Sequence, residues 1–195
     1  MRLIGLCGLI SSGKGTASDH LMEEHDYIGV SFAETLKDAA ACIFGWDRDM
    51  LEGSDAQARA ERELKDEWWS RRLGFDVSPR SMLQFMGTEV MRNNLHPEIW
   101  AYATEKRILE MSQEYPWANF VISDVRFPNE FQMIRRFGGQ IWHVRRGDLP
   151  EWFGKNPDHI HESEKAWNNE RFDHVLYNDH TIEDLKRAVD NLLQS

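Results

Sequence analysis

The segment Gly8-Leu9-Ile10-Ser11-Ser12-Gly13-Lys14-Gly15-Thr16 has the composition and spacing to hold a phosphate group. It follows a short apolar run, Leu3 to Cys7, and precedes a segment with helical periodicity. Between a buried strand and a helix, successive backbone N–H groups and the helix N-terminus face an anion. We therefore predict a phosphate-binding loop rather than an ordinary glycine turn, with ligating residues Gly8, Ser11, Ser12, Gly13, Lys14, Gly15 and Thr16.

Two side chains of this loop suit a nucleoside triphosphate with its magnesium ion. Lys14 can reach the β and γ phosphates and follow the transferred group. Because Gly15 stands directly after the lysine, the usual place of the Mg²⁺ ligand, that role falls to Thr16 or to a water molecule. Asp124 ends another predicted strand, so its carboxylate is expected at the same sheet edge, where it can hold Mg²⁺ through water. A helix-capping role is the alternative for Asp124. The predicted ligand is ATP with Mg²⁺, and the predicted metal residues are Thr16 and Asp124.

Arg126 lies two residues after Asp124 and can stabilise charge that develops on a transferred phosphoryl group. A surface ion pair with Glu130 is the alternative. The sequence has no glutamate directly after Asp124 to polarise water, and no Asn-Lys-x-Asp stretch to recognise guanine. Both features favour a transferase over a hydrolase.

Arg145 and Arg146 stand at the start of a loop rich in Gly and Pro, and Lys155 lies within it. Such a loop, at about 146–160, can close cationic side chains over phosphates and exclude water. We therefore expect a lid, with Arg145 and Arg146 as catalytic residues. A solvated loop with incidental charge is the alternative.

The cysteines and the His159–His161 loop do not predict a metal site. Cys7 and Cys42 have no metal-ligand spacing and are expected to be buried thiols. His159 and His161 alternate with other residues in a loop without a further His or Cys cluster, so the zinc interpretation is declined.

The elements that position these residues alternate along the chain. Apolar runs predict strands at 3–7, 27–32, 120–124, 140–144 and 175–177, and helical spacing fills 14–24, 33–44, 80–94, 97–114 and 131–137. Thr181 and Asp184 resemble a capping box that opens a last helix. The charge-dense residues 47–79 are predicted to form exposed helices or an insertion. This order predicts an α/β fold with a five-stranded parallel sheet between two layers of helices.

Composition limits the partners of the chain. The 195 residues are 41% hydrophobic, as expected of one globular domain, and the formal charge of −10 disfavours loose binding to nucleic acid or an anionic membrane. The amino terminus shows no secretory cleavage pattern and no apolar stretch approaches the roughly 18 residues of a membrane span, so a soluble cytoplasmic protein is expected. The sequence leaves the oligomeric state open, a homodimer included.

These features resemble the phage deoxynucleoside monophosphate kinases of the T-even type, within the P-loop kinase superfamily. The Gly-Lys-Gly-Thr form of the loop is typical of many nucleoside monophosphate kinases. Further short motifs follow in shared order and similar spacing, and only the region from about Phe44 to Ser78 lacks a counterpart. The motifs are Leu36-Lys37-Asp38-Ala39; Arg80, Leu83-Gln84, Gly87-Thr88-Glu89, Asn93-Asn94 and Trp100; Asp124, Arg126 and Glu130; His143-Val144-Arg145; His161-Glu162-Ser163-Glu164; and Asn178-Asp179.

The resemblance implies ATP- and magnesium-dependent phosphorylation of a deoxynucleoside monophosphate in a single P-loop kinase domain. Its core would be at about 1–44 and 117–195, with a helical acceptor-binding region at about 45–115. Residues that suit the acceptor's phosphate are Lys37, Arg80 and Arg92, and those that suit its base or sugar are Gln84, Thr88, Glu89 and Trp100. Packing in the core is the alternative for Trp100.

Two other functions stay open at this point. A P-loop kinase for another small phosphorylated acceptor, such as dephospho-coenzyme A, would share the loop but would not need the pattern from Arg80 to Trp100. A non-catalytic ATP-binding module would not need Lys14, Asp124, Arg126 and an arginine-bearing lid together.

Overall fold

The computed structural model describes residues 1–151, 153 and 162–194, and it divides into two compact units. Unit 1 comprises Met1–Ser31 and Thr104–Ser195, and unit 2 comprises Phe32–Ala103. The first boundary falls at Ser31, so the helix that follows β2 belongs to unit 2 rather than to the core at 1–44.

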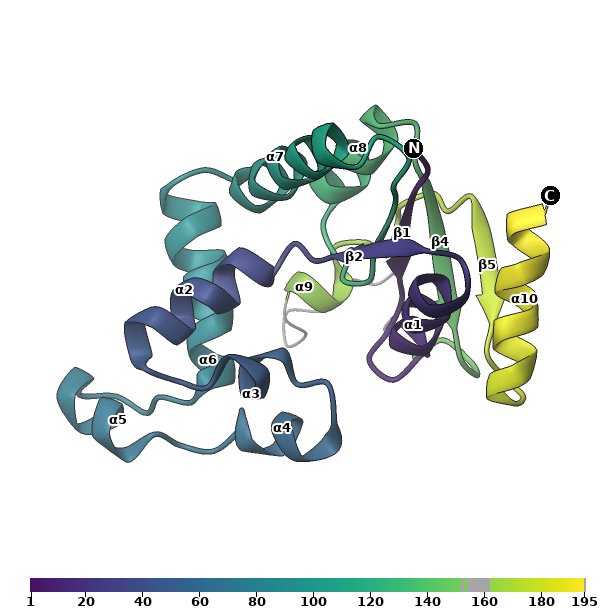
Figure 1. Cartoon of the computed structure of the whole chain (residues 1–195). Coiled ribbons are helices and arrows are strands. Elements are labelled where there is room, and N and C mark those ends of the chain that lie inside the picture. The colour runs from purple at the N-terminus through teal and green to yellow at the C-terminus, as the bar shows by residue number, and fades with distance from the viewer. Residues whose placement is uncertain (152, 154–161, 195) are drawn as a thin grey trace. The chain divides into compact units, whose positions relative to one another are not determined.

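Unit 1 is built on a five-stranded sheet with the order β2-β3-β1-β4-β5 (Figure 1). The strands are β1 (Leu3–Cys7), β2 (Tyr27–Val30), β3 (Asn119–Ile122), β4 (Gln140–Arg145) and β5 (His174–Tyr177). Every pairing is parallel, as in Leu3 opposite Phe120 and Gly5 opposite Ile141. The predicted α/β parallel sheet is therefore confirmed, and the carboxyl ends of all five strands meet at one edge.

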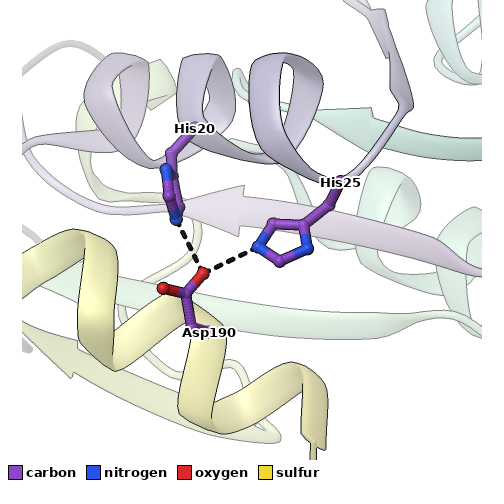
Figure 2. A group of neighbouring side chains, drawn as sticks. All are labelled: His20, His25 and Asp190. Atoms are coloured by element: carbon purple, nitrogen blue, oxygen red, sulfur yellow. Dashed lines mark hydrogen bonds and ion pairs between the residues drawn. The ribbon is translucent and has the colours of Figure 1, made fainter.

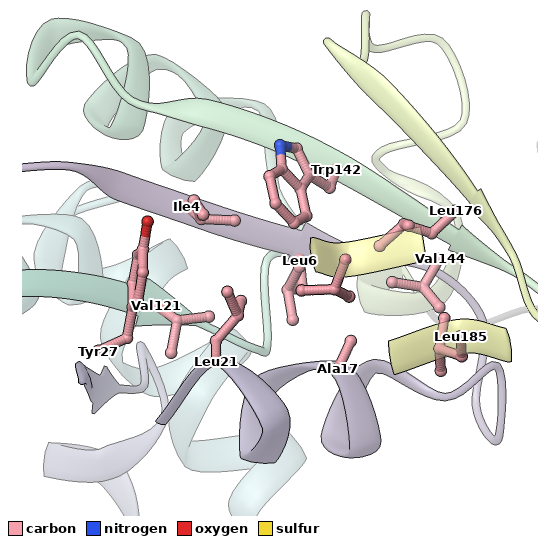
Figure 3. Packing of buried hydrophobic residues seen from close by; sticks show 11 residues of the cluster. Ile4, Leu6, Ala17, Leu21, Tyr27, Val121, Trp142, Val144, Leu176 and Leu185 are labelled. Carbon is pink, nitrogen blue, oxygen red and sulfur yellow. The ribbon is translucent and has the colours of Figure 1, made fainter. Parts of the chain in front are cut away.

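Residues of a strand alternate between the two faces of the sheet, so apolar side chains lie on both faces. Helices cover both faces and bury these side chains. Ile4 and Leu6 of β1 join the core under α1 (Lys14–Glu24) and α10 (Ile182–Gln194), whose Leu21 and Leu185 are fully buried (Figure 3). On the other face, Gly5 leaves room for Ile134 of α8 (Pro128–Arg136), since a Cβ there would lie 2.5 Å from its Cδ1.

Two further helices belong wholly or mainly to unit 1. They are the short α9 (Glu162–Lys165) and α7 (Ile99–Glu114), which is joined to α8 by an ion pair between Glu105 Oε2 and Arg136 Nη2 at 3.2 Å. The predicted capping box of α10 is confirmed, because Thr181 Oγ1 accepts from the Asp184 N–H and Asp184 Oδ2 accepts from the Thr181 N–H. In the described part of the chain, no helix is long and apolar enough to cross a membrane.

Unit 2 is helical, and its charge density has a structural reason. The helices are α2 (Glu34–Phe44), α3 (Arg48–Glu52), α4 (Ala56–Glu61), α5 (Glu67–Leu73) and α6 (Pro79–Gln84), followed by the π-helix η1 (Phe85–Asn93). Asp47, Asp55 and Asp66 each stand before a helix and accept hydrogen bonds from its first N–H groups. Residues 47–79 are thus short helices with acidic N-caps, as the exposed-helix interpretation predicted.

The segment 80–94 differs from the predicted α-helix, because it changes from α to π geometry at Phe85. Trp100 explains part of this difference. Its Nε1–H donates to the Gly87 carbonyl at 2.9 Å, which occupies an acceptor inside the helix. Gly87 is buried, and a Cβ at this position would lie 2.9 Å from Leu36 Cδ2, so the wide turn also brings its backbone close to α2.

The expectation of two buried thiols is half wrong. Cys7 is buried in the central strand, and burial raises the pKa of its thiol, so it stays protonated and unreactive. Cys42 is exposed, because it lies on a different face of α2 from the buried residues Leu36 and Ala40.

Candidate active site

The loop from Gly8 to Thr16 connects β1 to α1 at the carboxyl edge of the sheet. Gly8 has a φ of 150° and lies so close to β4 that a Cβ would be 2.2 Å from the Val144 carbonyl oxygen. Gly13, with a φ of 106°, is the N-cap of α1 and lacks a capping side chain. Among the described residues no side chain caps the first N–H groups of α1, so these groups can bind an anion, as the phosphate-loop prediction requires.

Lys14 folds back over this loop. Its Nζ donates to the carbonyl oxygens of Gly8 and Leu9 at 2.7 and 2.8 Å. Burial, and then the nearby positive charge of Arg126, lower the pKa of Lys14 to about 8. A bound anion would favour the charged form, so this ammonium group is well placed to bind phosphate.

The Ser12 side chain has the character of a ligand-binding hydroxyl. Its Oγ is buried, and within the described residues it has no hydrogen-bond partner. Asn178, directly after β5, fixes the backbone here, since its Nδ2 donates to the Ser12 carbonyl at 2.9 Å. Beside the loop lies a hollow of about 260 Å³, lined by Leu9, Ile10, Ser11, Ser12, His143, Val144, Arg145, Arg146 and Leu149.

Asp124 lies near the loop, two residues beyond the end of β3. The next residue, Val125, donates its N–H to the Leu6 carbonyl, which ties this segment to the end of β1. Asp124 Oδ2 accepts a hydrogen bond from the Ser31 hydroxyl at 2.7 Å. Its carboxylate and the Thr16 hydroxyl are hard oxygen donors of the kind that Mg²⁺ prefers, so the residues present fit this ion.

Arg126 forms an ion pair that differs from the surface pair considered from the sequence. Its Nη1 lies 2.6 Å from Glu164 Oε1 of α9. Glu130 is buried, and its Oε2 accepts the backbone N–H groups of Arg126 and Phe127 at 2.7 and 3.0 Å. Glu130 thereby fixes the backbone from which the Arg126 guanidinium extends.

The two arginines after β4 lie in different environments. Arg145 donates to the Gly147 carbonyl and lies over the Tyr177 ring, 5.8 Å from its centroid. Arg146 is exposed and lines the hollow beside the loop. Lys155, His159 and His161, with most of the expected lid at 146–160, lie outside the described residues.

All the residues expected to bind the acceptor are in unit 2. Lys37 Nζ pairs with Glu52 Oε1 at 2.6 Å, and Arg80 Nε pairs with Glu63 Oε1 at 3.2 Å. Arg92 Nη1 donates to the Pro97 carbonyl at 3.3 Å. Gln84 and Thr88 are half-buried and Glu89 is exposed.

Trp100 is 5% exposed and bonded to the Gly87 carbonyl, which favours the core alternative over stacking on a base. Its buried indole supports the π-helix that carries Thr88 and Glu89.

Comparison with known proteins decides the family. The family model described as deoxynucleotide monophosphate kinase matches residues 49–189. A protein of Acanthamoeba polyphaga mimivirus with the same description is 32% identical over 206 residues, which cover 100% of this chain and 99% of the viral protein. The chain belongs to the deoxynucleotide monophosphate kinase family. The enzyme class and the reaction expected from the sequence are thereby confirmed.

Other similarities are more limited. The deoxynucleoside-5′-monophosphate kinase of Escherichia phage T5 is 42% identical over 59 residues, which are 30% of this chain and 22% of the phage enzyme. Among solved structures, a sugar kinase from Janibacter sp. HTCC2649 aligns with a TM-score of 0.48 and 10% identity over 100% of this chain and 95% of its own. Dephospho-CoA kinase from Campylobacter jejuni aligns with a TM-score of 0.45 and 13% identity over 99% and 96%.

The structure shows the side-chain contacts of three further residues that the sequence did not connect with the site. Ser31 bonds Asp124, Glu164 pairs with Arg126, and Asn178 bonds the phosphate loop. Glu164 and Asn178 stand in motifs of the family resemblance, but neither motif reveals the partner. Ser31 follows β2 directly, and its position after a strand was the one signal in the sequence that could have indicated the carboxyl edge.

Proposed function

We propose that this kinase transfers the γ-phosphoryl group of Mg·ATP to the phosphate of a deoxynucleoside monophosphate, with the donor bound at the loop from Gly8 to Thr16. The observation that carries this proposal is that the loop presents polar groups, unbonded within the described part of the chain, and a lysine ammonium suited to bind phosphate. The α1 N-terminus has no capping side chain, the Ser12 hydroxyl is buried without a partner among the described residues, and the Lys14 ammonium spans the loop.

The proposed donor site needs the ion that Thr16 and Asp124 would hold. Bound Mg²⁺ would neutralise charge on the donor phosphates. Lys14 binds the β and γ phosphates, and Ser31 orients the Asp124 carboxylate through its hydroxyl. Arg126, held by Glu164, compensates charge on the transferred group, with Arg145 and Arg146 as further cations.

The proposed acceptor site uses the cations and amides of unit 2. Lys37, Arg80 and Arg92 supply charge for the monophosphate, and Gln84, Thr88 and Glu89 supply hydrogen bonds for base or sugar. No side chain needs to act as a general base, because an oxygen of the acceptor phosphate is already anionic near neutral pH and itself attacks. Alignment and charge neutralisation then supply the catalysis.

One panel of assays tests this function. ADP release is measured in a coupled assay with ATP, Mg²⁺ and each of the four deoxynucleoside monophosphates, their ribose counterparts, dephospho-coenzyme A, or no acceptor. We expect release that depends on a deoxynucleoside monophosphate and stops when Mg²⁺ is chelated. If ADP release is fastest with dephospho-coenzyme A, the proposed acceptor is wrong. If no acceptor supports ADP release, the protein is a non-catalytic ATP-binding module.

A further inference from the structure

Two histidines and an aspartate converge in unit 1 on the helices α1 and α10, and the donor site uses none of them (Figure 2). His20 Nε2 and His25 Nε2 each lie 2.7 Å from the same oxygen, Asp190 Oδ1. The two rings stand nearly perpendicular, at 86°, with centroids 5.3 Å apart. Both imidazoles thus direct one nitrogen to a single point.

The local structure holds these groups in place. His20 lies on the buried face of α1, one residue before the core residue Leu21, and its side chain is 8% exposed. His25 is the C-cap of α1. Asp190 follows the fully buried Val189 on α10, and α1 packs against α10. Burial of the two core residues therefore sets the positions of the polar ones.

The charge around the cluster favours a cation. His25 caps the C-terminus of α1, where the helix dipole is negative, and the last turn of α1 contains no basic residue. Glu23, Glu24 and Asp26 lie next to it in the sequence. Asp19, one residue before His20, lies near the acidic Glu23 and the basic Lys186.

The donor set and its exposure match a borderline divalent transition metal. Two imidazole nitrogens and one carboxylate oxygen are common ligands of Zn²⁺, and the side chains of His25 and Asp190 are 30% and 35% exposed, which leaves a face open to a water ligand. Ligands of a tetrahedral Zn²⁺ site lie about 3.3 Å apart, so each 2.7 Å contact must lengthen by about 0.6 Å. Small rotations of the partly exposed His25 and Asp190 side chains allow this.

The protonation of His20 is also compatible with a metal. A ligating imidazole presents a lone pair on Nε2 and carries its proton on Nδ1. In the metal-free chain Asp190 Oδ1 can only accept, so the His20 Nε2 that bonds it carries the proton, and Zn²⁺ binding must move that proton to Nδ1 or release it. His20 Nδ1 is buried and, within the described residues, has no hydrogen-bond partner, so no bond at that nitrogen opposes the change of tautomer. We infer that His20, His25 and Asp190 form a Zn²⁺-binding site that fastens the C-terminal end of the phosphate-loop helix α1 to α10.

Calorimetric titration of the metal-stripped, tag-free full chain with ZnCl₂ tests this inference. We expect one Zn²⁺ per chain and a rise in the thermal unfolding midpoint upon binding. His25→Gln and Asp190→Asn change partly exposed side chains, so they should fold normally by circular dichroism and bind Zn²⁺ roughly 100-fold more weakly. With Co²⁺ in place of Zn²⁺, the wild type should show the visible absorption of a tetrahedral site, and these two variants should not.

Two controls separate this site from other ligands. Cys42→Ser removes the exposed thiol and His180→Gln removes an exposed histidine outside the cluster, and both variants should bind Zn²⁺ as the wild type does. The inference is overturned if the stripped wild type binds no Zn²⁺, or if His25→Gln and Asp190→Asn bind it with unchanged affinity. In either case the three residues are a hydrogen-bonded clasp without a metal. Neither result bears on the kinase function, because the assay measures metal binding alone.

Discussion

Arg126 Nη1 lies 2.6 Å from Glu164 Oε1, an ion pair that joins the loop after β3 to α9. The same arginine has its backbone N–H bonded to the buried Glu130. Glu130 therefore restrains the backbone of Arg126, and Glu164 restrains its guanidinium group. Such restriction suits a cation that must meet a developing charge in a fixed position.

We expect Glu164→Gln to lower kcat about tenfold with little change in either KM, and Arg126→Ala to lower kcat by roughly 100-fold. The double variant should be no slower than Arg126→Ala, because Glu164 acts through Arg126. Steady-state kinetics of the three variants measure this coupling. Independent, multiplicative losses would show that Glu164 does not position Arg126.

Lys14 should make ATP binding sensitive to pH. Its pKa of about 8 in the free protein rises when phosphate binds, because an anion favours the charged form. Below this pKa the lysine is already charged and binding takes up no proton at this site. Above it, binding takes up a proton and affinity falls as pH increases.

Titration calorimetry with a non-hydrolysable ATP analogue, in buffers of different ionisation enthalpy, measures this proton uptake at pH 6.5 and pH 9. Lys14→Arg should remove the uptake at pH 9, because a guanidinium stays charged. Lys14→Ala should lower kcat by roughly 10²- to 10³-fold without unfolding the chain. Equal uptake at pH 9 in wild type and Lys14→Arg would assign the proton to another group.

Lys37 and Arg80 should act on the acceptor. A charge-assisted bond to phosphate contributes about 1.5–3 kcal/mol, so Lys37→Ala and Arg80→Ala should each raise the KM for the monophosphate by roughly 10- to 100-fold. The KM for ATP should change less. Arg59→Ala, which removes an exposed cation of α4, should leave both constants unchanged. A larger effect on ATP than on the monophosphate would place these cations at the donor.

His143 should make the fold sensitive to acid. Its ring lies among Phe153, Trp167 and Phe172, and burial, followed by the charges of Arg145 and Lys14, lowers its pKa from 6.5 to about 4. Above pH 6.5 the ring is neutral whether the chain is folded or unfolded, so it has no effect on the pH dependence. Between pH 6.5 and 4 only the unfolded chain binds the proton, so the free energy of unfolding decreases as the pH is lowered through this range.

Urea unfolding of the wild type and His143→Phe from pH 7.5 to pH 4 isolates this contribution. The variant should lose less stability than the wild type over the acid part of this range. Parallel losses in the two proteins would show that carboxylates elsewhere account for the acid sensitivity.

Local elements and the phosphate loop could be predicted from the amino-acid sequence alone. Alternating apolar runs and helical spacing predict every strand of the parallel sheet, because each element must bury one face or both. The loop from Gly8 to Thr16 could be recognised because its glycines, its lysine and its place between strand and helix all serve the same backbone geometry. The Thr181 and Asp184 capping box is likewise local, since both partners lie within one turn.

Contacts between residues that lie far apart in the chain could not be predicted from the sequence, because they depend on packing. Ser31 bonds Asp124 because parallel strands bring their carboxyl ends to one edge, and Asp190 bonds His20 because α1 packs against α10. Glu164 of α9 pairs with Arg126, which lies 38 residues earlier in the chain. The strand order β2-β3-β1-β4-β5 and the π geometry of Phe85–Asn93 also depend on packing, the latter on the bond from Trp100 to Gly87. Periodicity reports which face of an element is buried, but the identity of the group packed against it depends on contacts that no local pattern contains.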